Sequence, residues 1–535
     1  MTARTIRKKE NRPLFAIMVQ GTASNAGKSV IATALCRILY QEGYRVAPFK
    51  AQNMALNSYP TRDGGEIGRA QVVQAEAAEV EPTVDMNPIL LKPCSDKGCQ
   101  VIIHGKVYRN MTAQEYYAFK EQAFTFVRDS YRRLAQAFEI IVIEGAGSPA
   151  EINLRDWDIA NMRIAEMANS PVLLVADIDR GGVFASIVGT MELLSEKERE
   201  RIKGYIINKF RGDMDLLSPG LSFLGERTGL PVLGVIPYFR EISIPGEDSV
   251  CLEDGRGEHG TERVSIRIGV IRLPHISNYT DFDSLVQEPG VRVRYLVKAE
   301  EVYNTDVVVI PGSKNTIGDL IYLKKEGFEK AILRHHKKGG TIVGICGGFQ
   351  MLGLRVEDPW GMESDFREVQ GMGLLNAVTT LEQEKATFQV EAVPVSGRPY
   401  GEGWRLEGYE IHLGRTILGE GPAPFLKVFR RDGKGTVVLD GAISSDGKVW
   451  GTYIHGIFDH PGFRRSFLNT IREQKGLPPL DSPLTFNGRD FRRRQYDELA
   501  RLVRNSLEME RVFQIMGLVP GQESVVSNQE LTSDL

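Results

Sequence analysis

The stretch GTASNAGKS (residues 21–29) constrains the fold of this chain more than any other feature of its sequence. It follows the apolar segment Leu14–Gln20 and precedes a run whose apolar residues recur at helical spacing. A glycine-rich turn that ends in Gly-Lys-Ser between a strand and a helix is typical of a phosphate-binding loop. Five residues separate Gly21 from Gly27, one more than in the usual motif, so a plain glycine-rich turn is the alternative.

This loop predicts a nucleotide site. A lysine in this position neutralises phosphate oxygens, and the serine after it binds Mg²⁺. Glu144 and Asp177 each end an apolar strand, where an acid either binds Mg²⁺ or is simply solvated. The expected ATP-binding residues are Gly21, Thr22, Asn25, Ala26, Gly27, Lys28, Ser29 and Lys50, and the expected metal ligands are Ser29, Glu144 and Asp177. The segment NKFRGD (208–213) has Arg211 where the base-reading motif of GTPases has aspartate, which favours ATP over GTP.

Apolar strands alternate with helical segments along the first half of the chain, which predicts a parallel sheet covered on both faces. The expected strands are Leu14–Gln20, Glu139–Gly145, Pro171–Asp177, Lys203–Lys209 and Pro231–Pro237. A second α/β series follows a polar, glycine-bearing stretch, and 535 residues are too many for one core. We expect a basic N-terminal arm (1–13), a phosphate-loop domain (14–244), a linker (245–263), a second α/β domain (264–475) and a C-terminal helical segment with a frayed tail (476–535).

Charge and cysteine usage exclude several classes of protein. Lys and Arg total 66 against 69 for Asp and Glu, a net charge of -3 that argues against nucleic acid as a partner. No uninterrupted apolar run approaches the roughly 20 residues of a membrane span, and the basic start has no apolar core behind it, so it is not a secretory signal. Five scattered cysteines indicate a reduced, cytoplasmic protein. The sequence leaves open whether the chain forms a homo-oligomer.

A second reactive feature is Cys346, in GICGG between an apolar strand and a helix. A thiol must be deprotonated to act as a nucleophile, and a helix N-terminus favours the thiolate. Neighbouring glycines permit a strained turn, and the Gly347 N–H is placed to stabilise an oxyanion. The segment PGS (311–313), which contains Gly312, ends a neighbouring strand and is the expected second donor. His455 is the first candidate for the base and His412 the second. The alternative is a buried, inert thiol.

These residues carry a resemblance. GICGGFQMLG with YIHG resembles the class I glutamine amidotransferase domain, and GTASNAGKS with VIEGAGS resembles the dethiobiotin-synthetase-like ATPase fold. Their order, together with the string PFKAQNMALNSYPTRDGGEIGRAQVVQAEAAEVEPTVDMNPILLKP (48–93), closely resembles the cobyric acid synthase family over about residues 14–470. The resemblance implies two parallel-sheet α/β domains, the second flavodoxin-like.

The resemblance also implies an activity. The family amidates the b, d, e and g carboxylates of the corrin adenosylcobyrinic acid a,c-diamide in cobalamin biosynthesis, using ATP and Mg²⁺, with glutamine as the ammonia donor. Cys346 would attack glutamine, His455 would move the proton, and Gly312 and Gly347 would form the oxyanion hole beside Gln350. Lys50 would contact phosphate or the substrate carboxylate. The residues expected to bind the corrin are Gln52, Asn53, Asn57 and Ser58, which as an alternative cap their own loop.

One residue departs from the amidotransferase pattern. The glutamate expected two residues after the histidine is Ile457 here, and Asp459 follows two residues later, so His455 must be oriented in another way. Three other functions remain open at this point. They are a cobyrinic acid a,c-diamide synthase or another amidoligase of the same architecture, a phosphate-loop switch or partition ATPase, and a domain that senses glutamine without hydrolysing it.

Overall fold

The computed structural model describes residues 14–95, 98–239, 241–245, 264–364, 366–395, 400, 403–480 and 488–518. The predicted N-terminal arm (1–13), nearly all of the predicted linker (246–263) and the final residues of the predicted tail (519–535) lie outside the described residues.

Six parallel strands form the central sheet of the first half of the chain, in the order β12-β11-β10-β1-β9-β2. The parallel α/β fold predicted from the alternating pattern is therefore confirmed. The strands are β1 (Phe15–Gly21), β2 (Val46–Phe49), β9 (Ile140–Glu144), β10 (Val172–Asp177), β11 (Ile202–Phe210) and β12 (Val232–Pro237). The helices are α1 (Lys28–Gln41), α2 (Arg69–Ala77), α3 (Ala113–Ala137), α4 (Met162–Met167), α5 (Val183–Leu193), α6 (Glu196–Arg199) and α7 (Met214–Thr228).

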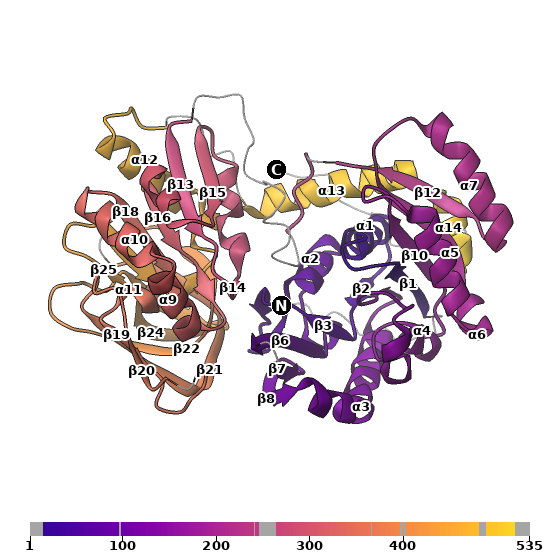
Figure 1. Ribbon diagram of the computed structural model, residues 1–535, viewed down its shortest axis with the longest axis horizontal. Coiled ribbons are helices and arrows are strands. Elements are labelled where there is room, and N and C mark those ends of the chain that lie inside the picture. Colours follow the sequence, from indigo (N-terminus) through magenta and orange to yellow (C-terminus); the bar gives the residue numbers. More distant parts are fainter. Residues whose placement is uncertain are drawn as a thin grey trace, which may run out of the picture.

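The chain between β2 and α3 forms a separate small layer beside this sheet. Its strands are β3 (Gln52–Met54), β6 (Ile89–Ser95), β7 (Gly98–Ile103) and β8 (Lys106–Thr112), in that order. A short hairpin of β4 (Ser58–Pro60) and β5 (Glu66–Gly68) projects from it. The sequence of this region predicted substrate-binding residues but not this layer of strands. Figure 1 shows that the layer faces the second half of the molecule.

The second half has its own mainly parallel sheet, in the order β15-β13-β16-β18-β26-β25, in which only β25 runs antiparallel to its neighbour. Its strands are β13 (Ile266–Ile271), β15 (Val291–Leu296), β16 (Val307–Ile310), β18 (Thr341–Ile345), β25 (Ala442–Ile443) and β26 (Val449–Thr452). Its helices are α8 (Asp283–Val286), α9 (Thr316–Lys325), α10 (Phe328–Lys337), α11 (Gly347–Leu352) and α12 (Pro461–Gln474).

A large, mostly antiparallel sheet accompanies it, and the sequence analysis did not predict this sheet. Its long hairpin joins β21 (Ala377–Pro394) to β22 (Leu406–Leu418), and β22 also pairs with β27 (Ile454–His455). The remaining strands are β19 (Arg355–Glu357), β20 (Glu368–Gln370), β23 (Leu426–Arg431) and β24 (Lys434–Asp440). The sheet matters for function because β27 contains His455.

The last described helices, α13 (Gly488–Ser506) and α14 (Met509–Met516), return to the first half of the molecule. Leu499 and Val503 are fully buried in the same core as Ile31 and Leu35 of α1. Figure 1 shows α13, in yellow, running from between the two halves over α1. This core in the first half of the molecule therefore combines residues of α1 with residues of the last described helices. Within the described ranges, none of the helices combines the length and the apolar character that a membrane span requires.

Candidate active site

The predicted phosphate loop lies at the carboxyl end of β1, and residues of β11 hold its shape. Gly27 has a φ of 106°, and a Cβ at this position would lie 2.0 Å from the Asn208 side chain. The Asn208 amide donates to the Ala26 carbonyl at 2.9 Å, and Lys209 donates to the Asn25 carbonyl at 2.9 Å. Only glycine therefore fits at position 27. Asn208 and Lys209 begin the segment NKFRGD, which resembles the base-reading motif of GTPases. In this structure they support the phosphate loop.

Ser29 at the start of α1 meets Glu144 at the end of β9, as the sequence analysis expected. The Ser29 hydroxyl donates to Glu144 Oε1 at 2.7 Å, and Lys50 Nζ donates to the same oxygen at 2.9 Å. Glu144 Oε2 accepts from Gln74 at 2.5 Å. A hydroxyl and a carboxylate oxygen this close fit two neighbouring positions around Mg²⁺, which prefers oxygen ligands in octahedral geometry.

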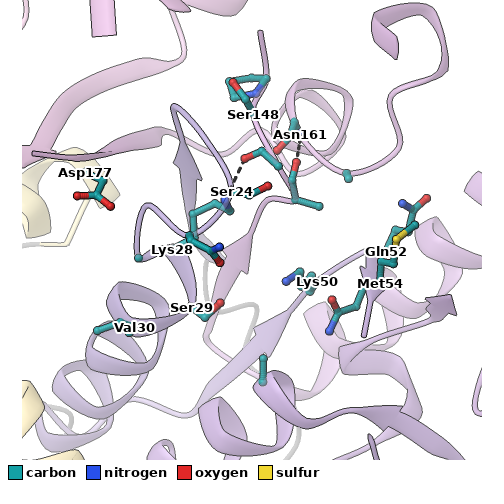
Figure 2. A pocket seen from close by; sticks show the side chains of 18 of the residues that line it. Ser24, Lys28, Ser29, Val30, Lys50, Gln52, Met54, Ser148, Asn161 and Asp177 are labelled. Carbon is teal, nitrogen blue, oxygen red and sulfur yellow. Dashed lines mark hydrogen bonds between the residues drawn. The ribbon is translucent and has the colours of Figure 1, made fainter. Parts of the chain in front are cut away.

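Asp177, the other predicted metal ligand, is engaged elsewhere. Its Oδ2 accepts from Lys209 at 2.7 Å, and its Oδ1 accepts from the Asp179 backbone N–H at 2.8 Å. Figure 2 shows Asp177 on the far side of the loop from Lys50 and Gln52. In the part of the chain that the structure describes, no three His, Cys, Asp or Glu side chains gather to hold a metal ion. The structure thus brings Ser29 and Glu144 together, whereas Asp177 lines the same cleft and pairs with Lys209, and its role as a Mg²⁺ ligand stays a prediction.

The phosphate loop opens into a cleft of about 1840 Å³. Asn25, Gly27, Lys28, Ser29 and Lys50 line it, whereas Ala26 is buried beneath the loop. Gln52, Asn53 and Asn57 line the same cleft, with Met54, whose side chain is 56% exposed. Figure 2 shows Lys28 and Ser29 across the cleft from Lys50 and Gln52. A cavity for one drug-sized ligand is about 300–1,000 Å³, so this cleft has room for a nucleotide and a second large molecule.

The lining of the cleft does not include four other expected residues, which are Gly21, Thr22, Glu144 and Ser58. Thr22 is in the first part of the loop, and its N–H donates to the Val175 carbonyl at 2.9 Å. Ser58 is fully buried where the two halves meet, and its hydroxyl donates to Glu66 at 2.6 Å. The predicted substrate segment is therefore divided, with its first part in the cleft and its last residue at the contact with the second half.

Cys346 occupies a strained turn between β18 and α11. Its φ of 52° and ψ of −110° are unusual for a residue with a Cβ. The turn packs closely against β16, because a Cβ at Gly348 would lie 1.9 Å from the Ile310 carbonyl oxygen. The thiol lies at the N-terminus of α11 and is 3.5 Å from the Ile411 carbonyl oxygen. This turn presents a single reactive side chain in a fixed direction.

His455 lies beside Cys346 and is oriented by Asp281, which the sequence analysis did not identify. His455 Nδ1 and Asp281 Oδ2 are 2.6 Å apart, and both side chains are almost fully buried. Asp281 belongs to the 3₁₀ helix η4 (Tyr279–Phe282), far from His455 in sequence. Asp459 instead accepts from Ser284 at 2.5 Å and from Arg492 at 3.2 Å. Asp281 therefore orients His455, the role that the usual pattern gives to a glutamate at the position of Ile457.

The two candidate bases, His455 and His412, differ in pKa because their surroundings differ. Burial opposes a charge on His455, but Asp281, by its charge and hydrogen bond, and Cys346 raise the pKa of His455 to about 10. Burial lowers the pKa of His412 to about 3, and the ring of His412 stacks on Tyr453 at 3.8 Å. His455 can thus accept a proton from the thiol, and His412 cannot serve as an effective base near neutral pH.

The backbone around Gly312, the predicted second oxyanion donor, pairs with a neighbouring strand. Lys314 N–H donates to the His275 carbonyl at 2.9 Å, and β17 (Gly312–Ser313) pairs antiparallel with β14 (Ile276–Ser277). Hydrogen-bonded pairs alternate along such a ladder, so the next pair is Gly312 with Ser277. The Ser313 N–H then points away from β14, and Ser313 N lies 3.0 Å from a Cβ built on Gly347. Ser313, rather than Gly312, is the residue whose N–H faces the Cys346 turn.

A small cavity of about 40 Å³ lies next to Cys346. It has room for about one to a few water molecules and not for a whole amino acid. Gln350 lines it, accepting from the Thr316 hydroxyl at 3.0 Å and donating to the Tyr453 hydroxyl at 3.2 Å. Glu363 also lines it, and burial raises the pKa of this carboxyl to about 7. Lys92 from the first half completes the wall.

Comparison with known proteins agrees with both halves of this description. Residues 17–249 match the family described as "CobQ/CobB/MinD/ParA nucleotide binding domain", and residues 267–463 match "CobB/CobQ-like glutamine amidotransferase domain". Among solved structures, PurLQS from Thermotoga maritima covers 44% of this chain and 97% of its own at 15% identity, and its TM-score of 0.29 is too low to add to the description. The two domains define a glutamine-dependent, amide-forming ligase that binds a nucleotide.

Full-length relatives narrow this class. The cobyric acid synthase of Caldanaerobacter subterraneus subsp. tengcongensis is 53% identical over 94% of this chain and 98% of its own. The cobyric acid synthase of Syntrophobacter fumaroxidans is 50% identical over 95% of this chain and 99% of its own. The chain belongs to the cobyric acid synthase family, and its function is that of a cobyric acid synthase in cobalamin biosynthesis. The diamide synthase and switch ATPase alternatives are set aside on this ground.

Proposed function

We propose that the chain converts the b, d, e and g carboxylates of adenosylcobyrinic acid a,c-diamide into amides, using one ATP and one glutamine for each. The observation that carries this proposal is that the phosphate loop and the segment Gln52–Asn57 line the same large cleft. Amide side chains suit a substrate that already carries amides, and the exposed Met54 offers an apolar contact to a corrin ring.

In the cleft, a corrin carboxylate attacks the γ-phosphate of ATP, giving an acyl phosphate and ADP. Ammonia then attacks the acyl carbon and displaces phosphate, leaving the amide. Lys28 neutralises charge on the transferred phosphate, and Lys50 orients the carboxylate or a phosphate oxygen. Ser29 and Glu144 would hold a magnesium ion, which when bound screens the phosphate charges. Lys50 also holds Glu144 in place through their buried ion pair of 2.9 Å.

At the second centre, Cys346 Sγ attacks the side-chain carbonyl of glutamine after giving its proton to His455. Asp281 keeps the His455 ring oriented and stabilises its protonated form. The backbone N–H groups of Gly347 and Ser313 stabilise the oxyanion. His455 returns the proton to the leaving ammonia, and water then hydrolyses the γ-glutamyl thioester to glutamate. Gln350 shapes the wall of this pocket.

The test is to incubate the purified protein with adenosylcobyrinic acid a,c-diamide, MgATP and a nitrogen source, and to follow the corrin by mass spectrometry. With glutamine, four amides are expected to appear stepwise. Cys346→Ala should lose this reaction with glutamine and keep it with ammonium, because only ammonia production needs the thiol. An unchanged corrin with continued ATP hydrolysis would reject the proposed substrate.

A further inference from the structure

Lys120 is a buried cation in the wall of the large cleft. It lies on α3, is 8% exposed and lines the cleft. Its ammonium group lies over the Tyr117 ring, 4.7 Å from the ring centroid. Among the residues that the structure describes, Lys120 has no hydrogen bond or ion pair. A buried charge is costly unless it is paired, so this side chain is suited to an anion that enters the cleft.

The acid whose charge acts on Lys120 is Asp158, and its carboxylate is engaged elsewhere. Asp158 Oδ1 accepts from the backbone N–H groups of Ala160 and Asn161 at 2.8 and 2.9 Å. Its Oδ2 accepts from the backbone N–H of Arg163 at 3.4 Å. Burial lowers the pKa of Lys120, and the charge of Asp158 opposes this shift. Asp158 therefore holds the backbone around the start of α4 and leaves Lys120 without a hydrogen-bonded carboxylate.

Two arginines that line the same cleft differ from Lys120, because each already has a carboxylate partner. Arg163 donates to the two oxygens of Glu121 at 2.6 and 2.9 Å. Arg155 pairs with Glu198. These ion pairs hold the two arginines and partly neutralise them before any ligand binds. Lys120 has no such pair, so a ligand that binds it does not have to displace a carboxylate of the protein.

The same face of α3 also orients Gln52. The Tyr116 hydroxyl donates to Gln52 Oε1 at 2.7 Å, and burial raises the pKa of Tyr116, so this hydroxyl stays protonated. The NH₂ group of Gln52 is then left to donate to a ligand in the cleft. Tyr116 and Lys120 are four residues apart on the helix and therefore share one face. This face thus brings a cation and an amide donor to one part of the wall, a pair that suits a carboxylate.

We propose that Lys120 binds a carboxylate of the corrin other than the one being amidated, with Gln52 donating to the same group. The phosphates of ATP are expected at Gly27–Ser29, at the start of α1, whereas Lys120 lies on α3 beside the corrin-binding segment. A contact at Lys120 holds the ring by one edge while another carboxylate reaches the phosphate loop. This inference rests on the function proposed above, because it takes the corrin as the occupant of the cleft.

The test measures binding of two corrins by isothermal titration calorimetry, without ATP or glutamine so that no reaction occurs. One is adenosylcobyrinic acid a,c-diamide, and the other is a corrin in which every peripheral carboxylate is an amide. Lys120→Met should bind the diamide about 10- to 100-fold more weakly than the wild type, as for the loss of a hydrogen bond to a charged group. It should bind the fully amidated corrin as the wild type does. Arg128→Met is the matched control, because Arg128 is an exposed cation on the same helix outside the cleft lining.

The two ligands separate a contact with the corrin from a merely structural role. Equal weakening for both corrins in Lys120→Met, or unchanged binding of both, would overturn the inference. In steady-state amidation with ammonium, the KM for the diamide should rise in Lys120→Met and the KM for ATP should not. A rise in the KM for ATP alone would assign Lys120 to the nucleotide instead. If the wild type does not amidate the diamide, the proposed function itself fails. If it does, and Lys120→Met binds the diamide as tightly as the wild type, only the role of Lys120 fails.

Discussion

The two centres of this molecule differ greatly in the space that they offer a ligand. The cleft beside the phosphate loop has a volume of about 1840 Å³, whereas the cavity beside Cys346 has a volume of about 40 Å³. Charged side chains such as Lys28 and Lys50 line the first. The second is small and is lined by buried groups from both halves of the chain, including Lys92 and Asn278. A large substrate with several reacting groups needs a wide cleft, whereas the ammonia released from glutamine needs only a small space.

The difference also shows in how each centre is held. The phosphate loop is fixed within one domain, by Asn208 and Lys209. The glutamine centre has its nucleophile, base and orienting acid on three separate elements, and its wall includes residues of the other domain. We therefore expect the chemistry of the first centre to continue without the second when ammonium is supplied.

Of the four tests that follow, Lys28→Met has the largest expected effect. It should impair the centre at the phosphate loop and leave the centre at Cys346 active. Because Lys28 stabilises the transferred phosphate, amidation should fall by roughly 10³-fold with either glutamine or ammonium. Glutamate release should continue, since Lys28 is remote from Cys346. The measurement is corrin mass spectrometry with a parallel glutamate assay. Loss of glutamine hydrolysis together with amidation would show that the two centres are not separate.

Asp281→Asn should reduce glutamine hydrolysis by roughly 10²-fold, because the His455 ring loses its orienting charge. Amidation driven by ammonium should not change. Asp459→Asn is the matched control, since Asp459 lies nearer in sequence to His455 but pairs with Ser284 and Arg492. Equal losses in both variants would reject Asp281 as the residue that orients the base.

The Asp281–His455 pair also predicts a pH dependence of stability. The pKa of His455 in the folded protein is about 10, above the ordinary value of 6.5. The stabilisation is therefore fully present below pH about 6.5 and is lost as the pH rises through about 10. We expect the urea midpoint difference between wild type and Asp281→Asn to be largest near pH about 6 and to shrink toward pH about 10. A difference that grows with pH would contradict this ion pair.

Arg492→Ala should have the smallest effect. It should lower the reaction that uses glutamine and leave the reaction that uses ammonium unchanged. Arg492 on α13 contacts Glu76 of the first half at 3.3 Å and Asp459 of the second at 3.2 Å, with 24% of its side chain exposed. Partly exposed ion pairs contribute about 1 kcal/mol or less. We expect a decrease of about twofold in glutamine-dependent amidation, and none with ammonium. Arg493→Ala, which removes the contact between Arg493 and Glu79, is the control.

The sequence predicted the features that depend on local pattern. The loop at Gly27–Ser29, the strand before it and the turn at Cys346 are contiguous stretches whose chemistry can be recognised without a fold. The contact between Ser29 and Glu144 could be predicted because the loop that leads to Ser29 follows β1, and Glu144 ends the neighbouring parallel strand β9. These predictions needed only the rule that such strand ends share one edge of a sheet.

Other features depend on contacts between distant segments and could not be predicted. Asp281 lies 174 positions from His455, in a stretch with several acids and no periodic pattern to single it out. The burial of Ser58 and its link to Asn278 arise only when the two domains meet. The return of α13 to α1 is likewise a tertiary contact, although the apolar spacing of Leu499 and Val503 was a visible sign of a helix face that needs a partner.

The most direct test of the central claim uses glutamine labelled with heavy nitrogen at its side-chain amide, together with an excess of unlabelled ammonium, MgATP and adenosylcobyrinic acid a,c-diamide. If the centre at Cys346 supplies the large cleft directly, the new corrin amides will carry heavy nitrogen despite the excess of unlabelled ammonium, and those made by Cys346→Ala will not. New amides whose label matches the bulk ammonium in the wild type would contradict direct supply and leave the two centres merely joined in one chain.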